Sequence, residues 1–283
     1  MNVLVLAALV VLGALDPGRI DAAIGFHGKM MPGEVYRVSM PRSDLQVTVD
    51  GIALKTALAL GGYAVYEAAP KGTLVMGDLP LLEPEVAPVQ KRLSASGFEI
   101  TALHNHLLRD APHVMYMHFM KIGDAVQISQ QLHEALQTTA VSFPSGAAKP
   151  ATPEQFAYGA QIDSALNLKG TAHDGIYSVS APRKGRVIVH GVTLPPAMGV
   201  ATAVNFQDDG NGKIATTGDF VLTAGQVDPV RAALVSHGIE VTALHQHLVG
   251  AEPTLYFMHF WAAGTPAEIL PALRAAIDIA TSA

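Results

Sequence analysis

The chain contains an internal duplication, and this restricts its fold to two copies of one module. The segment MGDLPLLEPEVAPVQKRLSASGFEITALHNHL (residues 76–107) aligns without a gap to TGDFVLTAGQVDPVRAALVSHGIEVTALHQHL (217–248). Between the copies, SFPSGAAKPATPE is rich in Pro, Ser, Ala and Gly, the composition of a linker. We therefore predict a first module over residues 16–141, a linker over 142–154 and a second module over 155–283.

Hydrophobic periodicity predicts an α+β fold in which each module has an antiparallel sheet and a ferredoxin-like β-α-β-β-α tail. Alternating apolar residues indicate strands at residues 36–40 and 47–49, and another strand ends at Asp78. A helix follows near Val86. The two strands expected next, 98–107 and 114–121, are joined by a short polar loop and followed by a final helix from Asp124.

The second module contains clearer signals for where its helices begin. Asp228 and Pro229 have the residue types favoured at the N-cap and first position of a helix. Further along, Thr265 and Glu268 have the spacing of a capping box. We expect the sheets of the two modules to pack against each other.

Both modules contain the same pattern of three histidines. TALHNHLLRDAPHVMYMHF (101–119) and TALHQHLVGAEPTLYFMHF (242–260) each have His-x-His, eleven residues and a third His. Residues two apart in a strand share a face, and a hairpin brings the third His beside the first. The predicted metal ligands are His104, His106, His118, His245, His247 and His259.

Three neutral imidazoles leave one coordination position open on Zn²⁺, which is the arrangement of a catalytic zinc site. Cu, Ni or Fe would also accept these ligands. Because the chain has no cysteine, thiolate ligands are excluded. The alternative is that duplication copied structural histidines, which would need hydrogen bonds in a buried core. The pattern favours a divalent metal, with zinc as the leading candidate, in or beside the interface between the modules.

Two acidic residues are candidates for catalysis. Glu85, replaced by Gln226 in the second module, could act as a general base or an additional ligand. Asp78, matched by Asp219, follows glycine at an expected strand end and could orient a ligand imidazole. The alternatives are a first-turn helix residue for Glu85 and a turn residue for Asp78. Arg42 either binds an anionic substrate or is a solvated strand end.

Composition excludes several classes of function. Hydrophobic residues make up 49% of the chain and charged residues 15%, which is typical of a packed globular protein. A net charge of −6 argues against a nucleic-acid partner. The apolar run at residues 3–15 is too short to span a bilayer but has the length of a signal-peptide core, the alternative being a buried first strand or helix. We predict a signal peptide over residues 1–15, a periplasmic or secreted location and no stable membrane insertion.

The segments VSMPRSDLQVTVDG, MGDLPLL, FEITALHNHLL and MHF resemble the LppY/LpqO family of bacterial lipoproteins, a domain of unknown function. The resemblance covers nearly the whole chain and implies an exported bacterial protein with a duplicated domain. Because the chain has no cysteine, it has no lipobox and lipid anchoring is not expected.

The leading functional prediction is an exported metal-dependent hydrolase that acts on a small-molecule or envelope substrate. Two alternatives stay open at this point. One is a non-catalytic protein that binds or delivers metal. The other is a small-ligand-binding protein whose histidines are structural.

Overall fold

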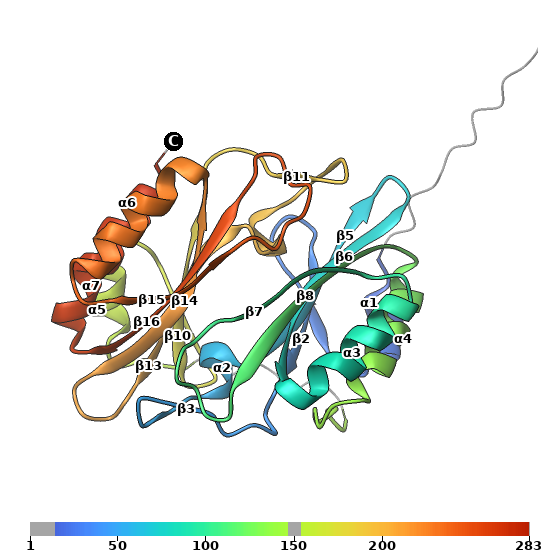
Figure 1. Cartoon of the computed structure of the whole chain (residues 1–283), viewed down its shortest axis with the longest axis horizontal. Helices are drawn as coiled ribbons and strands as arrows, with labels where there is room; N and C mark the ends of the chain where they lie inside the picture. The colour runs from blue at the N-terminus through green and yellow to red at the C-terminus, as the bar shows by residue number, and fades with distance from the viewer. Residues whose placement is uncertain (1–14, 147–153, 283) are drawn as a thin grey trace, which may run out of the picture.

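The computed structural model describes residues 15–146 and 154–282. In this part of the chain, two antiparallel six-stranded sheets, one from each module, face each other with helices on their outer sides (Figure 1). This arrangement confirms the predicted α+β class and the two similar modules. Residues 1–14 of the predicted signal peptide and 147–153 of the predicted linker lie outside the described residues.

The first module confirms the predicted β-α-β-β-α tail. Its sheet has the order β1-β2-β5-β6-β8-β7. The predicted strand at residues 47–49 forms only a two-residue arm, β3, which pairs with β4 outside the main sheet. The elements are α1 (Pro17–Ile24), β1 (Gly28–Met30), β2 (Tyr36–Pro41), β3 (Thr48–Val49), β4 (Ile52–Ala53), α2 (Thr56–Ala59), β5 (Gly61–Ala69), β6 (Gly72–Leu82), α3 (Glu83–Ala95), β7 (Glu99–Asn105), β8 (Val114–Gly123) and α4 (Ala125–Leu136).

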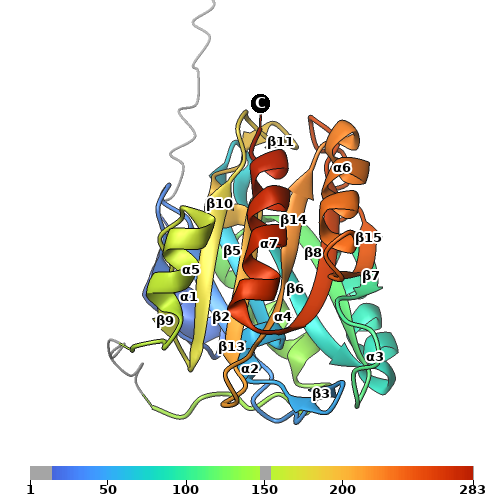
Figure 2. The ribbon, with the colours of Figure 1, turned by 90° about the vertical axis from the view of Figure 1, so that its left-hand side faces the viewer.

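The second module repeats this succession, and its sheet has the equivalent order β15-β16-β14-β13-β10-β9. Figure 2 shows its helices lying across the outer face of this sheet. The elements are α5 (Gly159–Leu166), β9 (Thr171–His173), β10 (Ile176–Pro182), β11 (Ile188–Val189), β12 (Val192–Thr193), η1 (Pro196–Met198), β13 (Ala201–Asp208), β14 (Ile214–Leu222), α6 (Ala224–Val235), β15 (Glu240–His245), β16 (Tyr256–Gly264) and α7 (Pro266–Ala280).

Each sheet buries both of its faces. On the outer side of the first sheet, Val38 and Met40 of β2 join a core that includes Ile24 of α1 and Leu132 of α4. Burying a side chain of this size contributes about 1.5–3 kcal/mol, so the helices hold their sheet firmly. The intervening residues of the same strands point to the other module, because successive side chains of a strand alternate between faces.

The interface between the sheets is apolar at both ends. At one end, Val65 and Met76 of the first module pack with Val221 and Phe257 of the second. At the other end, Tyr116 packs with Trp261. Each module also extends a short arm across the interface, since α2 contacts β13 and β14 while η1 contacts β5. Polar residues occupy the middle of the interface.

The predicted start of a second-module helix at Asp228 is wrong. Helix α6 begins at Ala224, because Thr223 and Gln226 form a capping box in which the Thr223 N–H donates to Gln226 Oε1 at 2.9 Å. Pro229 therefore lies inside the helix rather than at its first position. The predicted box at Thr265 is confirmed, as its N–H donates to Glu268 Oε2 at 2.8 Å.

None of the helices within the described ranges is both long enough and apolar enough to cross a membrane.

Candidate metal centre

The register of the central strands pairs each module's aspartate with its third histidine. Asp78 of β6 lies opposite His118 of β8, and Asp219 of β14 lies opposite His259 of β16. The prediction that both aspartates end a strand is wrong, because the apolar alternation continues and β6 runs on to Leu82. Asp78 and Asp219 are therefore mid-strand residues on the faces that meet at the interface, and the alternative of a turn is excluded.

The His-x-His segments lie where the edge strands end. His104 pairs with Tyr116 and lies diagonal to His118, with ring centroids 5.0 Å apart. His106 follows the last residue of β7, so only the first histidine of the segment belongs to the strand. Its ring stacks on Tyr116 with centroids 3.4 Å apart, which holds it beside the other histidines. In the second module His245 is the last residue of β15, so again only the first histidine of the segment belongs to the strand.

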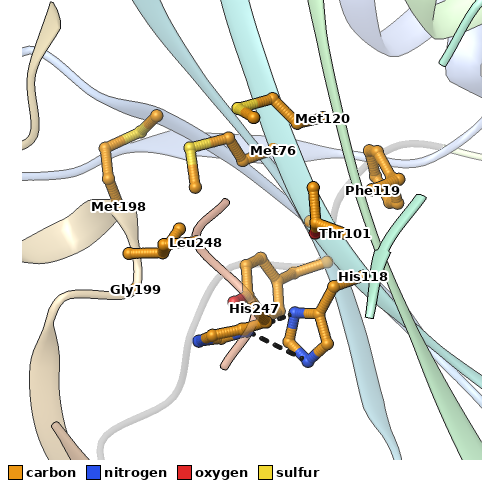
Figure 3. Close-up of a pocket in the computed structure, with 11 residues that line it drawn as sticks. Met76, Thr101, His118, Phe119, Met120, Met198, Gly199, His247 and Leu248 are labelled. Atoms are coloured by element: carbon orange, nitrogen blue, oxygen red, sulfur yellow. Dashed lines mark hydrogen bonds between the residues drawn. The ribbon is translucent and has the colours of Figure 1, made fainter. Parts of the chain in front are cut away.

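All six predicted ligands converge in one cluster at the interface. The closest contacts join histidines of different modules: His118 and His247 have Nδ1 atoms 2.6 Å apart (Figure 3). The equivalent pair, His106 and His259, has ring centroids 3.8 Å apart. Between these pairs, the rings of His104 and His245 are 3.5 Å apart. The cluster thus has pseudo-two-fold symmetry, and each half contains histidines from both modules.

Many polar atoms of this cluster are buried without a hydrogen-bond partner among the described residues. The side chains of His118, His247 and His259 are at most 7% exposed. Native proteins pair the great majority of their buried polar groups, so a concentration of unpaired ones needs an explanation. The unpaired atoms are His104 Nε2, His106 Nε2, His245 Nδ1 and Nε2, His247 Nε2, His259 Nε2, Asp78 Oδ1 and Asp219 Oδ1.

Burial keeps the imidazoles neutral. Loss of hydration lowers the pKa of His104 to about 4. Loss of hydration and, to a smaller extent, repulsion from His104 together lower the pKa of His245 to about 3. Burial also lowers the pKa values of the remaining histidines of the cluster. Neutral imidazole is the form that binds a metal.

The same burial acts in the opposite direction on the aspartates. It raises the pKa of Asp78 to about 7, although the backbone N–H of Leu79 and the charge of Arg37 partly offset it. The pKa of Asp219 is raised by burial and then by the charge of Asp78. Burial therefore shifts both carboxyl groups toward their protonated form, and a cation beside them would favour the ionised form.

Among the residues that the structure describes, three sets of ligand atoms are close enough to share an ion, with all atoms of a set within 4.8 Å of one another. Two of these sets combine both modules, and all contain imidazole nitrogen. Imidazole suits Zn, Cu, Fe and Ni, so the donor chemistry fits the metals predicted from the sequence. The sets are His104 with His118 and His245, His104 with His106 and His259, and Asp78 with His106 and His118.

A cavity of about 510 Å³ between the sheets reaches this centre. The residues that line its inner end include His106, His118, His247, His259 and both aspartates. Its size falls in the range of about 300–1,000 Å³ that is typical of small-molecule sites. A second cavity, of about 10 Å³, lies beside His118 and His247 and is walled by methionines, among them Met76 and Met198 (Figure 3).

Glu85 does not join the histidine cluster. It lies in the first turn of α3, where its carboxylate accepts hydrogen bonds from Arg42 at 2.7 and 3.0 Å. It also accepts the N–H of Ala140 at 3.1 Å and so ties α3 to the end of the module. Arg42 itself is 2% exposed, which corrects its prediction as a solvated strand end and leaves it no access to a substrate.

The sequence did not single out Arg37 and Tyr63, which also line the large cavity. The guanidinium carbon of Arg37 lies 3.9 Å from the centroid of the Tyr63 ring. Arg37 alternates with Tyr36 and Val38 along β2, so it lies on the face of the strand opposite the helices, a position that the sequence alone does not distinguish from a solvent-facing one.

Comparison with curated proteins gives no significant match. Among solved structures, the trimeric bacterial microcompartment shell protein PduB has 12% sequence identity, covers 91% of both chains and gives a TM-score of 0.23. EtuB from Clostridium kluyveri has 10% identity, covers 90% of both chains and gives a TM-score of 0.22. Scores this low carry no conclusion about fold or function.

A family model described as Domain of Unknown Function (DUF1259) matches the chain twice, at residues 18–138 and 160–279. The two matches fall on the two modules and cover most of the sequence. This chain therefore belongs to the DUF1259 family, as a protein with two copies of its domain.

Proposed function

We propose that this protein binds divalent metal at the histidine cluster between its modules and acts as a metal-dependent hydrolase. The observation that supports the proposal is the set of buried imidazole nitrogens and carboxylate oxygens that converge without partners. Leaving one such group unpaired costs about 1–3 kcal/mol, and a bound metal would satisfy several of them at once.

The large cavity favours catalysis over storage. It leads to the histidines and both aspartates, so a small molecule could reach the centre. Zn²⁺ held by imidazoles lowers the pKa of water to about 7 and polarises a scissile carbonyl or phosphoryl group. The chain's own contribution is to hold the ligands rigidly, because two sheets and two edge strands fix them from opposite sides.

Asp78 is the residue to which we assign proton transfer. Its carboxylate oxygens lie 3.7 Å from His106 Nε2 and 3.7 Å from His118 Nε2, facing the cavity. A carboxylate at this position can accept a proton from water and return it to a leaving group. Asp219 occupies the equivalent position beside His259.

Metal analysis of protein purified without a His-tag tests the proposal. His118 belongs to two of the three candidate ligand sets, whereas His247 contacts His118 across the interface but belongs to none of them. We therefore expect His118→Ala to lose more of the bound zinc than His247→Ala, and the double variant to lose no more than His118→Ala. His237→Ala, which changes an exposed histidine bonded to its own helix, is the matched control.

Two outcomes would contradict the proposal. If the wild-type protein takes up no zinc, copper, nickel or iron on reconstitution, the cluster is not a metal centre. If zinc is bound but p-nitrophenyl acetate, p-nitrophenyl phosphate and a chromogenic amide are not hydrolysed faster than by the His118→Ala variant, the hydrolase assignment fails. The second result would favour a protein that binds or delivers metal.

A further inference from the structure

The large cavity is chemically one-sided. Its first-module wall contains Arg37, and the equivalent position in the second module is Ser178. Tyr63, which lies opposite Asp78 in the sheet, has Ala203 as its counterpart opposite Asp219. The pseudo-symmetry of the metal centre therefore does not extend along the cavity, and one wall alone presents a guanidinium.

Away from the histidine cluster, the polar groups that face Arg37 from the second-module wall are hydrogen-bonded within the protein. The Ser178 hydroxyl donates to Asn205 Oδ1 at 2.7 Å, and Asn205 Nδ2 donates to the carbonyl of Leu58 at 3.2 Å. These residues hold the wall in place and leave few donors for a ligand. Ser178 and Asn205 therefore contribute no charge to ligand recognition.

Arg37, in contrast, has no hydrogen bond to any described residue and no carboxylate within 4.0 Å. Its one close partner is the ring of Tyr63, which fixes the guanidinium plane and leaves its edge free. Burial lowers the pKa of Arg37, and the charges of Tyr63 and Asp78 offset this only in part. The guanidinium is half-buried and has no hydrogen-bonded counter-ion among the described residues, which leaves a place for an anion.

The other charged residues of the cavity do not neutralise Arg37. At its mouth, exposed Lys29 and Asp174 have opposite signs. Deep in the cavity, Asp78 and Asp219 lie against the histidines, where a bound divalent metal would neutralise them. Arg37 then provides the net positive charge of the inner cavity.

We propose that the cavity binds an organic anion whose carboxylate or phosphate group is held by Arg37 while the rest of the molecule extends to the metal centre. This rests on the proposed function, because it names the substrate class of that same centre. Arg37 lies on β2, two strands from β6, so roughly 10 Å separates its backbone from that of Asp78. A chain of a few carbon atoms would bridge the two groups.

Calorimetry with hexanoate, hexyl phosphate, hexanol and hexylamine on zinc-loaded protein tests the inference. At least one of the anions should bind more tightly than the neutral and cationic probes, and comparison of the two distinguishes a carboxylate from a phosphate site. Arg37→Gln should lower the affinity for that anion by roughly ten-fold or more, since charge-assisted bonds are lost. The affinity of Arg37→Lys should lie between those of wild type and Arg37→Gln, because lysine keeps the charge but not the planar guanidinium.

Two further variants make the test independent of folding defects. Ser178→Asp places a carboxylate on the opposite wall and should also weaken anion binding. Arg231→Gln, at an exposed ion pair with Asp228 on α6, should change nothing. If both anions bind no better than hexanol, or if Arg37→Gln and Ser178→Asp bind them as wild type does, the inference is wrong.

The same titrations on metal-free protein separate this inference from the metal proposal. Anion binding that needs Arg37 but not zinc would support the Arg37 site even if no metal centre existed. Binding that needs zinc and is insensitive to Arg37→Gln would overturn the Arg37 site and leave the metal centre intact. Zinc content of Arg37→Gln should equal that of wild type, because Arg37 is no part of the ligand sets.

Discussion

The two modules have the same fold but differ in the charge of the residue at the start of one helix. In the first module, Arg42 is buried against Asp44 and Glu85. In the second, Gln226 replaces Glu85, and its amide donates to the carbonyls of Ile279 and Ala280 at 3.0 and 3.2 Å. Glu85 also accepts the N–H of Ala140, so both residues connect the start of one helix to the end of the module. The second module keeps this connection without the ion pair.

The histidine cluster differs from this pattern because its two halves have the same residue types. The six histidines and two aspartates are matched position by position between the modules. The cavity that leads to them is not symmetric, because Arg37 on one side corresponds to Ser178 on the other. A ligand held by Arg37, as proposed above, would therefore enter in one orientation, and the following variants compare the two halves.

The largest effect is expected on zinc content when the two central histidines, His104 and His245, are replaced. His104 belongs to two of the three sets of candidate ligands, whereas His245 belongs to one. His104→Ala should therefore remove most of the bound zinc, and His245→Ala should leave the set of His104, His106 and His259 intact. Metal content after dialysis against free zinc measures the difference. Equal losses in the two variants would show that the sets do not act as separate sites.

Exchanging the residue types of Glu85 and Gln226, which lie in the first turns of α3 and α6, should have the next largest effect, on the free energy of unfolding. Glu85→Gln removes the charge that pairs with buried Arg42 and leaves Asp44 as its one carboxylate, so we expect a loss of about 3 kcal/mol in the free energy of unfolding. Gln226→Glu places a carboxylate against two carbonyl oxygens and should cost about 1–3 kcal/mol. Urea unfolding monitored by circular dichroism gives both values.

Glu83→Gln, at an exposed position of the same helical turn, is the control for helix-dipole effects and should change stability by about 0.5 kcal/mol or less. An unchanged urea midpoint for Glu85→Gln would mean that the ion pair with Arg42 contributes nothing to folding. In that case the two modules would be equivalent at this position despite their different residues.

The sequence predicted what depends on local pattern and duplication. The strand pairs, their helices and the histidines followed from periodicity and spacing, which neighbouring residues determine. The cross-module pairing of His118 with His247 could not be predicted, because it depends on how the sheets pack. Arg37 was missed for the same reason, since an arginine alternating along a strand has the pattern of a solvent-facing residue until a second sheet covers it.

The smallest effect on stability is expected at the contact between the two edge strands, β7 and β15. Asn105 Nδ2 donates to the carbonyl of Leu107 and, across the interface, to that of Thr242, both at 3.1 Å. Its counterpart Gln246 is exposed and makes no such bond among the described residues. Asn105→Gln should therefore lower the free energy of unfolding by about 1 kcal/mol, the value of one or two hydrogen bonds.

The reverse change, Gln246→Asn, should stay within about 0.5 kcal/mol of wild type, as is usual for exposed positions. Thermal unfolding of both variants in the presence of chelator isolates this contribution from metal binding. If Gln246→Asn proved as destabilising as Asn105→Gln, the edge strands would be held symmetrically and the asymmetry would be confined to the cavity. If only Asn105→Gln is destabilising, the first module supplies the bond that fixes its partner's edge strand beside the histidines.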